Sequence, residues 1–156
     1  MPSATDRVRE ALRRLGVEAE IREFPQGTRT AAEAAAAVGT SVAQIVKSLV
    51  FLADGRPVLV LVSGANRVDP LRLARALGAH AVQRADADTV RRVTGFVIGG
   101  VPPVGHATPL AVVMDRELLR HDQVFAAAGT PQAVFAIAPQ RLAEITRATP
   151  ADIREG

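Results

Sequence analysis

The hydrophobic and polar positions of this chain follow two periods, and each period predicts one kind of secondary structure. Apolar spacing, together with capping and stop signals, predicts helices at 5–15, 30–39, 70–77, 86–93 and 139–146. Short apolar runs predict strands at 19–24, 44–52, 57–63, 80–82, 110–114, 124–128 and 133–138. Single helical turns are expected at 41–44 and 116–120, and the last ten residues are expected to fray.

Local signals set the boundaries of these elements. Thr5 is expected to cap the first helix, Thr30–Glu33 forms a capping box for the second, and Asp69 precedes the third. A turn is expected at 25–27. Asp54-Gly55 is a two-residue hairpin signal, so the strands on either side of it should be antiparallel.

The order of the elements indicates the fold class. Short helices are interspersed with strands, some of which are joined by hairpins, and this order predicts an α+β fold. We expect a central mixed, largely antiparallel β-sheet or barrel surrounded by helices. The length suits a single domain over residues 1–156, and 48 % hydrophobic residues can supply its core.

Composition and charge narrow the chemistry. The absence of cysteine excludes disulfides, thiolate catalysis and cysteine metal sites, and the three histidines lack metal-ligand spacing, so neither a metal nor a cofactor is expected. A net charge of +3 permits a polyanionic partner such as tRNA without requiring one. No apolar run reaches membrane-spanning length, so a soluble, cytoplasmic protein with no membrane contact is expected.

Lys47 is the first candidate for a functional residue. It lies in the middle of the apolar run QIVKSLVFL and is the only lysine, whereas the other eighteen of the 19 basic residues are arginine. A charged group inside an apolar run is unfavourable unless it is paired or hydrogen-bonded. Lys47 is therefore either a site that needs an amine or an edge-strand lysine whose head reaches water.

The second candidate is the loop Gly99–His106, with the sequence GGVPPVGH. Its glycines let the backbone approach a ligand and its prolines stiffen it, so it could hold backbone N–H groups at fixed positions. The alternative interpretation is that this loop is a plain connection between strands. His106 is either a general base or a structural histidine, and Thr130 is compatible with an ordinary turn.

Several motifs together resemble one family. Lys47 in IVKSLVF, the segment Val62–Asp69, the GGVPPVGH loop, Met114-Asp115 and Ala127–Thr130 occur in the order and at the spacing of the YbaK/prolyl-tRNA synthetase-associated domain family. The resemblance covers about Arg22 to Thr146 and implies a mixed sheet or barrel with helices around it.

The resemblance implies an aminoacyl-tRNA deacylase that hydrolyses the ester of a mischarged tRNA in trans. The expected amino acid is small, such as alanine, serine or threonine, and the tRNA could be that for proline. Mischarged aminoacyl-tRNA is the expected partner, and an aminoacyl-tRNA synthetase is a second candidate.

The resemblance also implies roles for individual residues. It assigns catalysis to Lys47, Gly99 and Gly100, with Lys47 anchoring the 3′ end of the substrate and the loop facing the aminoacyl carbonyl. The residues expected to bind substrate are Val101, Pro103, Gly105, His106, Gly129 and Thr130. The attacking water would be activated by the free ribose hydroxyl.

Two positions depart from the family pattern, and three other functions are compatible with the residues. Ala65 stands where many members have an acidic residue, and His106 occurs in only some members. The main alternative is a non-catalytic tRNA-binding or regulatory relative. The others are a Schiff-base enzyme with Lys47 as nucleophile and a protein-interaction domain.

Overall fold

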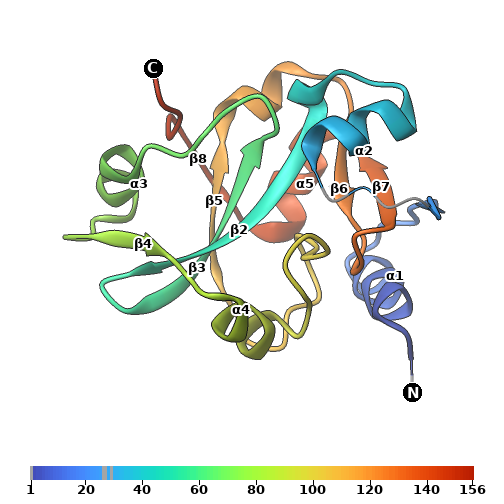
Figure 1. The fold of residues 1–156 in the computed structure, drawn as a ribbon, viewed down its shortest axis with the longest axis horizontal. Helices are drawn as coiled ribbons and strands as arrows, with labels where there is room; N and C mark the ends of the chain where they lie inside the picture. Colours follow the sequence, from blue (N-terminus) through green and yellow to red (C-terminus); the bar gives the residue numbers. More distant parts are fainter. Residues whose placement is uncertain (1, 26–27, 29) are drawn as a thin grey trace.

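A mixed β-sheet forms the centre of the molecule in the computed structural model, which describes residues 2–25, 28 and 30–156 (Figure 1). Neighbouring strands follow the order β1-β7-β6-β2-β3-β5-β8 across the sheet, and β4 lies outside this order and pairs with β2. The pairs β2/β6, β3/β5 and β5/β8 are parallel and the others are antiparallel. The strands are β1 (Ile21–Glu23), β2 (Ile45–Ala53), β3 (Arg56–Ser63), β4 (Val82–Arg84), β5 (Ala111–Asp115), β6 (Val124–Ala127), β7 (Ala133–Ile137) and β8 (Thr149–Ala151).

Five α-helices within the described residues surround this sheet (Figure 1). They are α1 (Ala4–Arg14), α2 (Ala31–Val38), α3 (Pro70–Leu77), α4 (Ala87–Thr94) and α5 (Pro139–Thr146), with single 3-10 turns η1 (Val42–Gln44) and η2 (Arg116–Arg120). Figure 1 places α1 and α2 at the end of the sheet that carries β6 and β7, and α3 at the other end beside β4.

The alternation of side chains along β2 and β3 supplies both halves of the core. Val46, Val50, Leu59 and Leu61 face a larger cluster that includes buried residues of α1 and α5. Leu49, Phe51, Val58 and Val60 face a smaller cluster that α3 and the C-terminal segment cover. Because β3 is central and covered on both faces, it reads as a continuous apolar run.

The two edges of β2 differ, and this difference positions the site. One edge pairs with β3 along its whole length. On the other edge, β6 pairs with Ile45 and Val46, and β4 pairs with Phe51 to Ala53. The Ala85 N–H, directly after β4, donates to the Val50 carbonyl at 3.0 Å. Residues 47–49 thus pair with no strand on this edge among the described residues, which leaves a gap in the sheet.

The predicted fold class is confirmed as a mixed sheet surrounded by helices, and most boundary signals act as expected. Thr30 and Glu33 form the capping box, and Asp69 caps α3 by accepting from the backbone N–H groups of Leu71 and Arg72. The turn expected at 25–27 includes residues 26 and 27, which lie outside the described residues.

Two local predictions are wrong. The first helix is capped by Ser3, whose hydroxyl accepts from Asp6, whereas Thr5 is buried inside the first turn. The last ten residues do not fray: β8 pairs with β5, and Ile153 is fully buried. A buried isoleucine gains apolar burial that offsets the entropy of ordering the tail.

Candidate active site

A cavity of about 240 Å³ opens at the gap in the sheet beside β2. Its walls come from residues 45–49 of β2, the start of α2, the loop at 98–101, β6 and Val134 of β7. The lining is mostly apolar. Sites for drug-sized ligands usually measure roughly 300–1,000 Å³, so this cavity suits a group smaller than a whole nucleotide.

Ser48 supplies polar groups inside this apolar cavity. Its hydroxyl oxygen is buried and has no hydrogen-bond partner among the described residues. In an antiparallel pair of strands, the backbone N–H and C=O groups of every second residue point toward the partner strand, and those of the residues between point away from it. The Ile45 carbonyl accepts a 2.7 Å hydrogen bond from the Gly64 N–H, so the backbone of Ile45 points toward the β3 side. The same alternation directs the backbone of Lys47 toward β3 and the N–H and C=O of Ser48 toward the gap.

Lys47 is half-buried at the cavity wall. Its ammonium donates a 2.6 Å hydrogen bond to the backbone carbonyl of Asn66, in the loop that follows β3. Burial lowers the pKa of Lys47 below its usual range, and the positive charges of Arg67 and Arg84 lower it further, whereas Asp115 opposes these effects. The amine therefore has one backbone partner and remains free to donate to a bound anion or carbonyl.

Of the glycine pair at 99–100, Gly99 lines the cavity wall and Gly100 does not. Gly99 lines the cavity with a φ of +92°, which a side chain would strain. Gly100 packs on the backbone of Thr130, and a Cβ at position 100 would lie 2.6 Å from the Thr130 Cα. Val101 is buried and also lines the cavity. The close approach of residues 100 and 130 thus sets the position of this wall.

The second half of the loop lies farther from the cavity. Pro103 is buried, and neither it nor Gly105 or His106 is part of the cavity lining. The Nε2 of His106 lies 2.7 Å from the carbonyl oxygen of Pro102, so this nitrogen carries the proton and the ring closes the loop. Burial lowers the pKa of His106, although the bond to Pro102 opposes this shift.

Gly129 and Thr130, expected to bind substrate, do not line the cavity. Gly129 has a φ of +101°, and a Cβ there would lie 2.8 Å from the Ala4 carbonyl oxygen at the start of α1. The Thr130 hydroxyl accepts a hydrogen bond from the Gln132 N–H, and the Thr130 backbone packs against the backbone of Gly100. Both residues therefore contact other parts of the chain, α1 and the Gly99–His106 loop.

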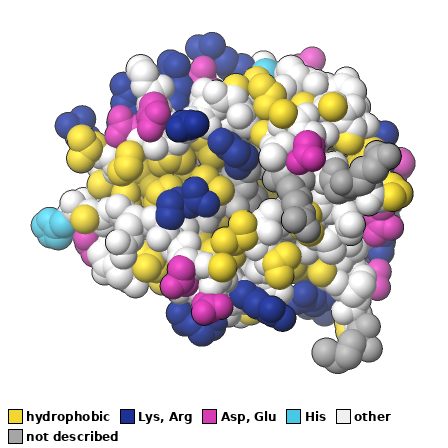
Figure 2. All heavy atoms as spheres, in the orientation of Figure 1, with side chains coloured by type: hydrophobic (Ala, Val, Ile, Leu, Met, Phe, Trp, Pro, Cys, Tyr) yellow, Lys and Arg dark blue, Asp and Glu magenta, His cyan; other side chains and the backbone are white. Residues whose placement is uncertain are grey.

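The remaining surface carries scattered charge. On the face drawn in Figure 2, hydrophobic side chains gather between α3 and β2, with several basic side chains beside them. In residues 2–25, 28 and 30–156, no group of three His, Asp or Glu side chains is arranged to hold a metal.

The helices in this part of the chain are also too short or too polar to cross a membrane.

The family model of the aminoacyl-tRNA editing domain matches residues 25–145. The chain belongs to this family. The family model covers every residue of the cavity wall, and its matched region contains Lys47 and the Gly99–His106 loop. The family expected from the sequence is thus confirmed.

Individual relatives agree with this assignment. The chain is 32 % identical over 130 residues to the uncharacterized protein YwhH of Bacillus subtilis, covering 83 % of this chain and 82 % of YwhH. It is 37 % identical over 92 residues to the proline–tRNA ligase of Geobacter sp., covering 59 % of this chain but only 16 % of the ligase. Its structure matches one described as that of a possible trans-editing enzyme for prolyl-tRNA synthetase, with a TM-score of 0.94, 46 % identity and coverage of 100 % and 99 %.

Two residues of this site have no role in the sequence-based assignment. Ser48 lines the cavity, and its N–H and C=O point toward the gap in the sheet. The one signal for it is a hydroxyl in an otherwise apolar strand, directly after the single lysine. Asn66 offers no signal of this kind, because it contacts Lys47 through its backbone carbonyl, which every residue has.

Proposed function

We propose that the protein is an aminoacyl-tRNA deacylase that hydrolyses the ester of a mischarged tRNA in trans. The observation that carries this proposal is the half-buried Lys47 beside a small, mostly apolar cavity, within a chain of the aminoacyl-tRNA editing family. The cavity would accept the amino acid, and Lys47 would hold the 3′ end of the tRNA. A deacylase of this kind would work in the cytoplasm, where translation takes place.

The 240 Å³ cavity supports a small amino acid such as alanine, serine or threonine. A small apolar cavity excludes large side chains by overlap, but it gains only about 1–3 kcal/mol per methylene when it selects among small ones. The Ser48 hydroxyl would distinguish polar from apolar side chains. The similarity to proline–tRNA ligases and to the trans-editing protein supports tRNA for proline as the carrier.

The proposed chemistry needs no group beyond water and the substrate. Water attacks the aminoacyl carbonyl and passes a proton to the free hydroxyl of the terminal ribose, which in turn gives its own proton to the neighbouring ester oxygen. The bond between the carbonyl carbon and this oxygen breaks, which releases the amino acid and a ribose with both hydroxyls free. The backbone at Gly99 and Gly100 would face the carbonyl, and preorganised donors of this kind supply several kcal/mol in other enzymes.

Lys47 would anchor the substrate rather than attack it. Its ammonium is a compact charge that donates in several directions, which suits the terminal phosphate or the ester. An arginine has a wider, planar head that would not fit between the cavity wall and the Asn66 carbonyl. Lys47→Arg should therefore fail although it preserves the charge.

The deciding experiment measures hydrolysis of a panel of aminoacyl-tRNAs by the wild-type protein, Lys47→Ala and Lys47→Arg. We expect selective loss of one small mischarged species with the wild type and little turnover with either variant. Retained tRNA binding without turnover of any species would instead favour the non-catalytic relative. Trapping of a substrate carbonyl on Lys47 by borohydride would favour a Schiff-base enzyme.

A further inference from the structure

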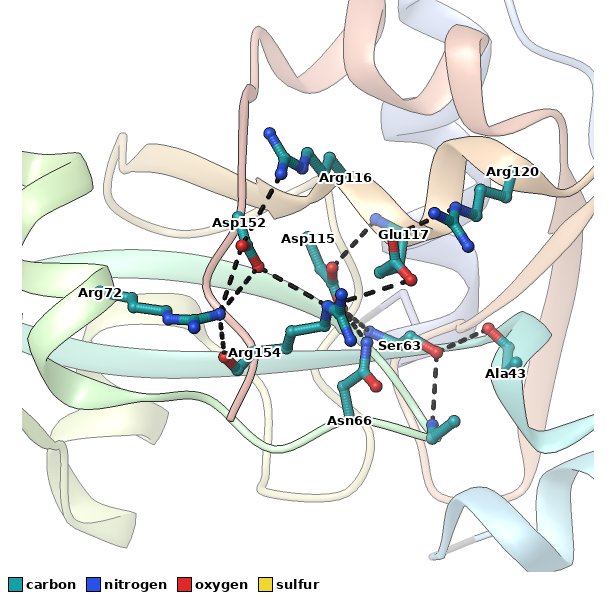
Figure 3. Close-up of polar contacts among 11 residues, drawn as sticks. Ala43, Ser63, Asn66, Arg72, Asp115, Arg116, Glu117, Arg120, Asp152 and Arg154 are labelled. Carbon is teal, nitrogen blue, oxygen red and sulfur yellow. Dashed lines mark hydrogen bonds and ion pairs between the residues drawn. The ribbon is translucent and has the colours of Figure 1, made fainter. Parts of the chain in front are cut away.

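Asp115 is a carboxylate that the proposed chemistry does not use. It ends β5, is fully buried, and lies where β3, β5 and η2 meet (Figure 3). A buried carboxylate is unfavourable unless its oxygens are hydrogen-bonded. Here it accepts from the Ser63 backbone at 3.2 Å, from the Glu117 backbone at 3.0 Å and from the Asn66 side chain at 2.9 Å.

The contact with Asn66 connects this carboxylate to the candidate active site. The side-chain amide of Asn66 is held by Asp115, and the backbone carbonyl of the same residue accepts from the Lys47 ammonium. Fixing the side chain of Asn66 limits the rotation of its backbone, so the position of the carbonyl depends on Asp115. Asp115 and Lys47 are thus joined through a single residue.

The C-terminal segment holds the same loop from outside. The Asp69 N–H donates to the Ile153 carbonyl at 2.7 Å, and the Glu155 N–H donates to the Arg67 carbonyl at 2.9 Å. Asp152 also lies among Arg72, Arg116 and Arg154, as Figure 3 shows. The loop that carries Asn66 is therefore anchored on both sides, which is unusual for a surface loop.

We infer that Asp115 and Asn66 are positioning residues for Lys47: the buried carboxylate fixes the Asn66 loop, and the Asn66 carbonyl sets where the Lys47 ammonium meets the substrate. The inference rests on the proposed function for its activity readout, but not for its structural readout. The charged groups near Lys47 are Arg67 on this loop, Arg84 on β4 and Asp115 itself. Asp115 is the one negative charge among these three, so it also favours the protonated amine.

The single lysine makes the test direct, because protein labelled with ¹³C and ¹⁵N in lysine gives one side-chain signal, that of Lys47. The variants are Asn66→Ala, Asp115→Asn and the two combined. Glu117→Gln is the matched control, since it removes a neighbouring carboxylate that pairs only with Arg120 and Arg154 among the described residues. The lysine signal and its pH titration are recorded without substrate, and kcat/KM for deacylation is measured separately.

We expect Asn66→Ala to shift and broaden the Lys47 signal and to lower kcat/KM about tenfold, the scale of a lost hydrogen bond to a charged group. Asp115→Asn should additionally lower the pKa of Lys47. The double variant should be no worse in kcat/KM than the more damaging single variant, because both act through one path. Glu117→Gln should leave the signal and the rate unchanged.

An unchanged Lys47 signal and rate in Asn66→Ala would overturn the inference, and so would additive losses in the double variant. If Asp115→Asn does not fold, Asn66→Ala still decides, since Asn66 is a partly exposed loop residue. If the wild type deacylates nothing, the proposed function fails while the lysine signal still tests the positioning.

Discussion

Gly100→Ala tests whether the wall of the cavity is placed by a close backbone contact. The added Cβ would lie 2.6, 2.8 and 2.9 Å from the Cα, carbonyl carbon and nitrogen of Thr130. All three are backbone atoms, so no flexible side chain can move aside. Gly100 does not have a positive φ, so an alanine there is opposed by overlap and not by its own backbone conformation.

The overlap has to be relieved by movement of the loop, which carries Gly99 and Val101 away from β2. Overpacking of this kind costs about 1–3 kcal/mol of the free energy of unfolding. Displacement of a reacting group by about 1 Å can lower a rate by about a hundredfold. We therefore expect Gly100→Ala to remain folded, with a modestly lower unfolding midpoint, and to lose about a hundredfold in deacylation kcat/KM.

Gly78→Ala is the matched control. Gly78 ends α3 with a φ of +65°, and a Cβ added there would have no neighbouring atom within 4 Å, so alanine costs about 1–2 kcal/mol through backbone strain alone. The two variants should be destabilised to a similar extent in urea, whereas only Gly100→Ala should lose activity. Wild-type kcat/KM in Gly100→Ala, or an equal loss in Gly78→Ala, would refute the assignment of this wall.

Three further predictions concern Ser48, Lys47 and the C-terminal segment. Ser48→Ala should raise the free energy of unfolding in urea by about 1 kcal/mol, because it removes a buried hydroxyl that has no partner among the described residues, and should lower kcat/KM. Lys47→Met should be more stable than the wild type at neutral pH, because burial opposes the charged amine. Between the lowered pKa of Lys47 and its usual value, the folded protein binds fewer protons than the unfolded chain. The stability of the wild type should therefore rise relative to that of Lys47→Met as the pH increases through this window. Chemical unfolding at a series of pH values measures this difference. Ile153→Ala should lower the free energy of unfolding by about 2–5 kcal/mol, whereas the exposed Leu71→Ala should change it by less than about 0.5 kcal/mol.

Each of these predictions has a contradicting result. A less stable Ser48→Ala would mean that its hydroxyl is hydrogen-bonded in solution. A difference between Lys47→Met and the wild type that does not change with pH would mean that the amine is solvated. Equal stability of Ile153→Ala and Leu71→Ala would mean that the tail frays.

Local signals predicted most of the secondary structure because each acts over a few residues. The Thr30 capping box, Asp69 before α3 and the Asp54-Gly55 turn all act as expected. The prediction of a frayed tail was wrong, because β8 has no local signal and its stability comes from pairing with β5 and from the burial of Ile153.

The candidate site divides in the same way. The unusual chemistry of Lys47 in an apolar run, and the glycines and prolines after residue 98, could be recognised from composition and spacing. The sequence could not separate Gly99 and Val101, which line the cavity, from Gly105 and His106, which do not. That separation depends on how the loop turns against α1 and the Thr130 backbone.

The sequence by itself determined the family, the alternation of helices and strands, and the residue whose chemistry is exceptional, because these follow from residue type and short spacing. Only the tertiary structure decided that residues 47–49 of β2 pair with no described strand between β6 and β4, so that Ser48 lines a cavity. It alone brings Asp115, Asn66 and Lys47 together from β5, a loop and β2. Contacts between residues 19 and 49 positions apart depend on sheet pairing, and no local pattern encodes that pairing.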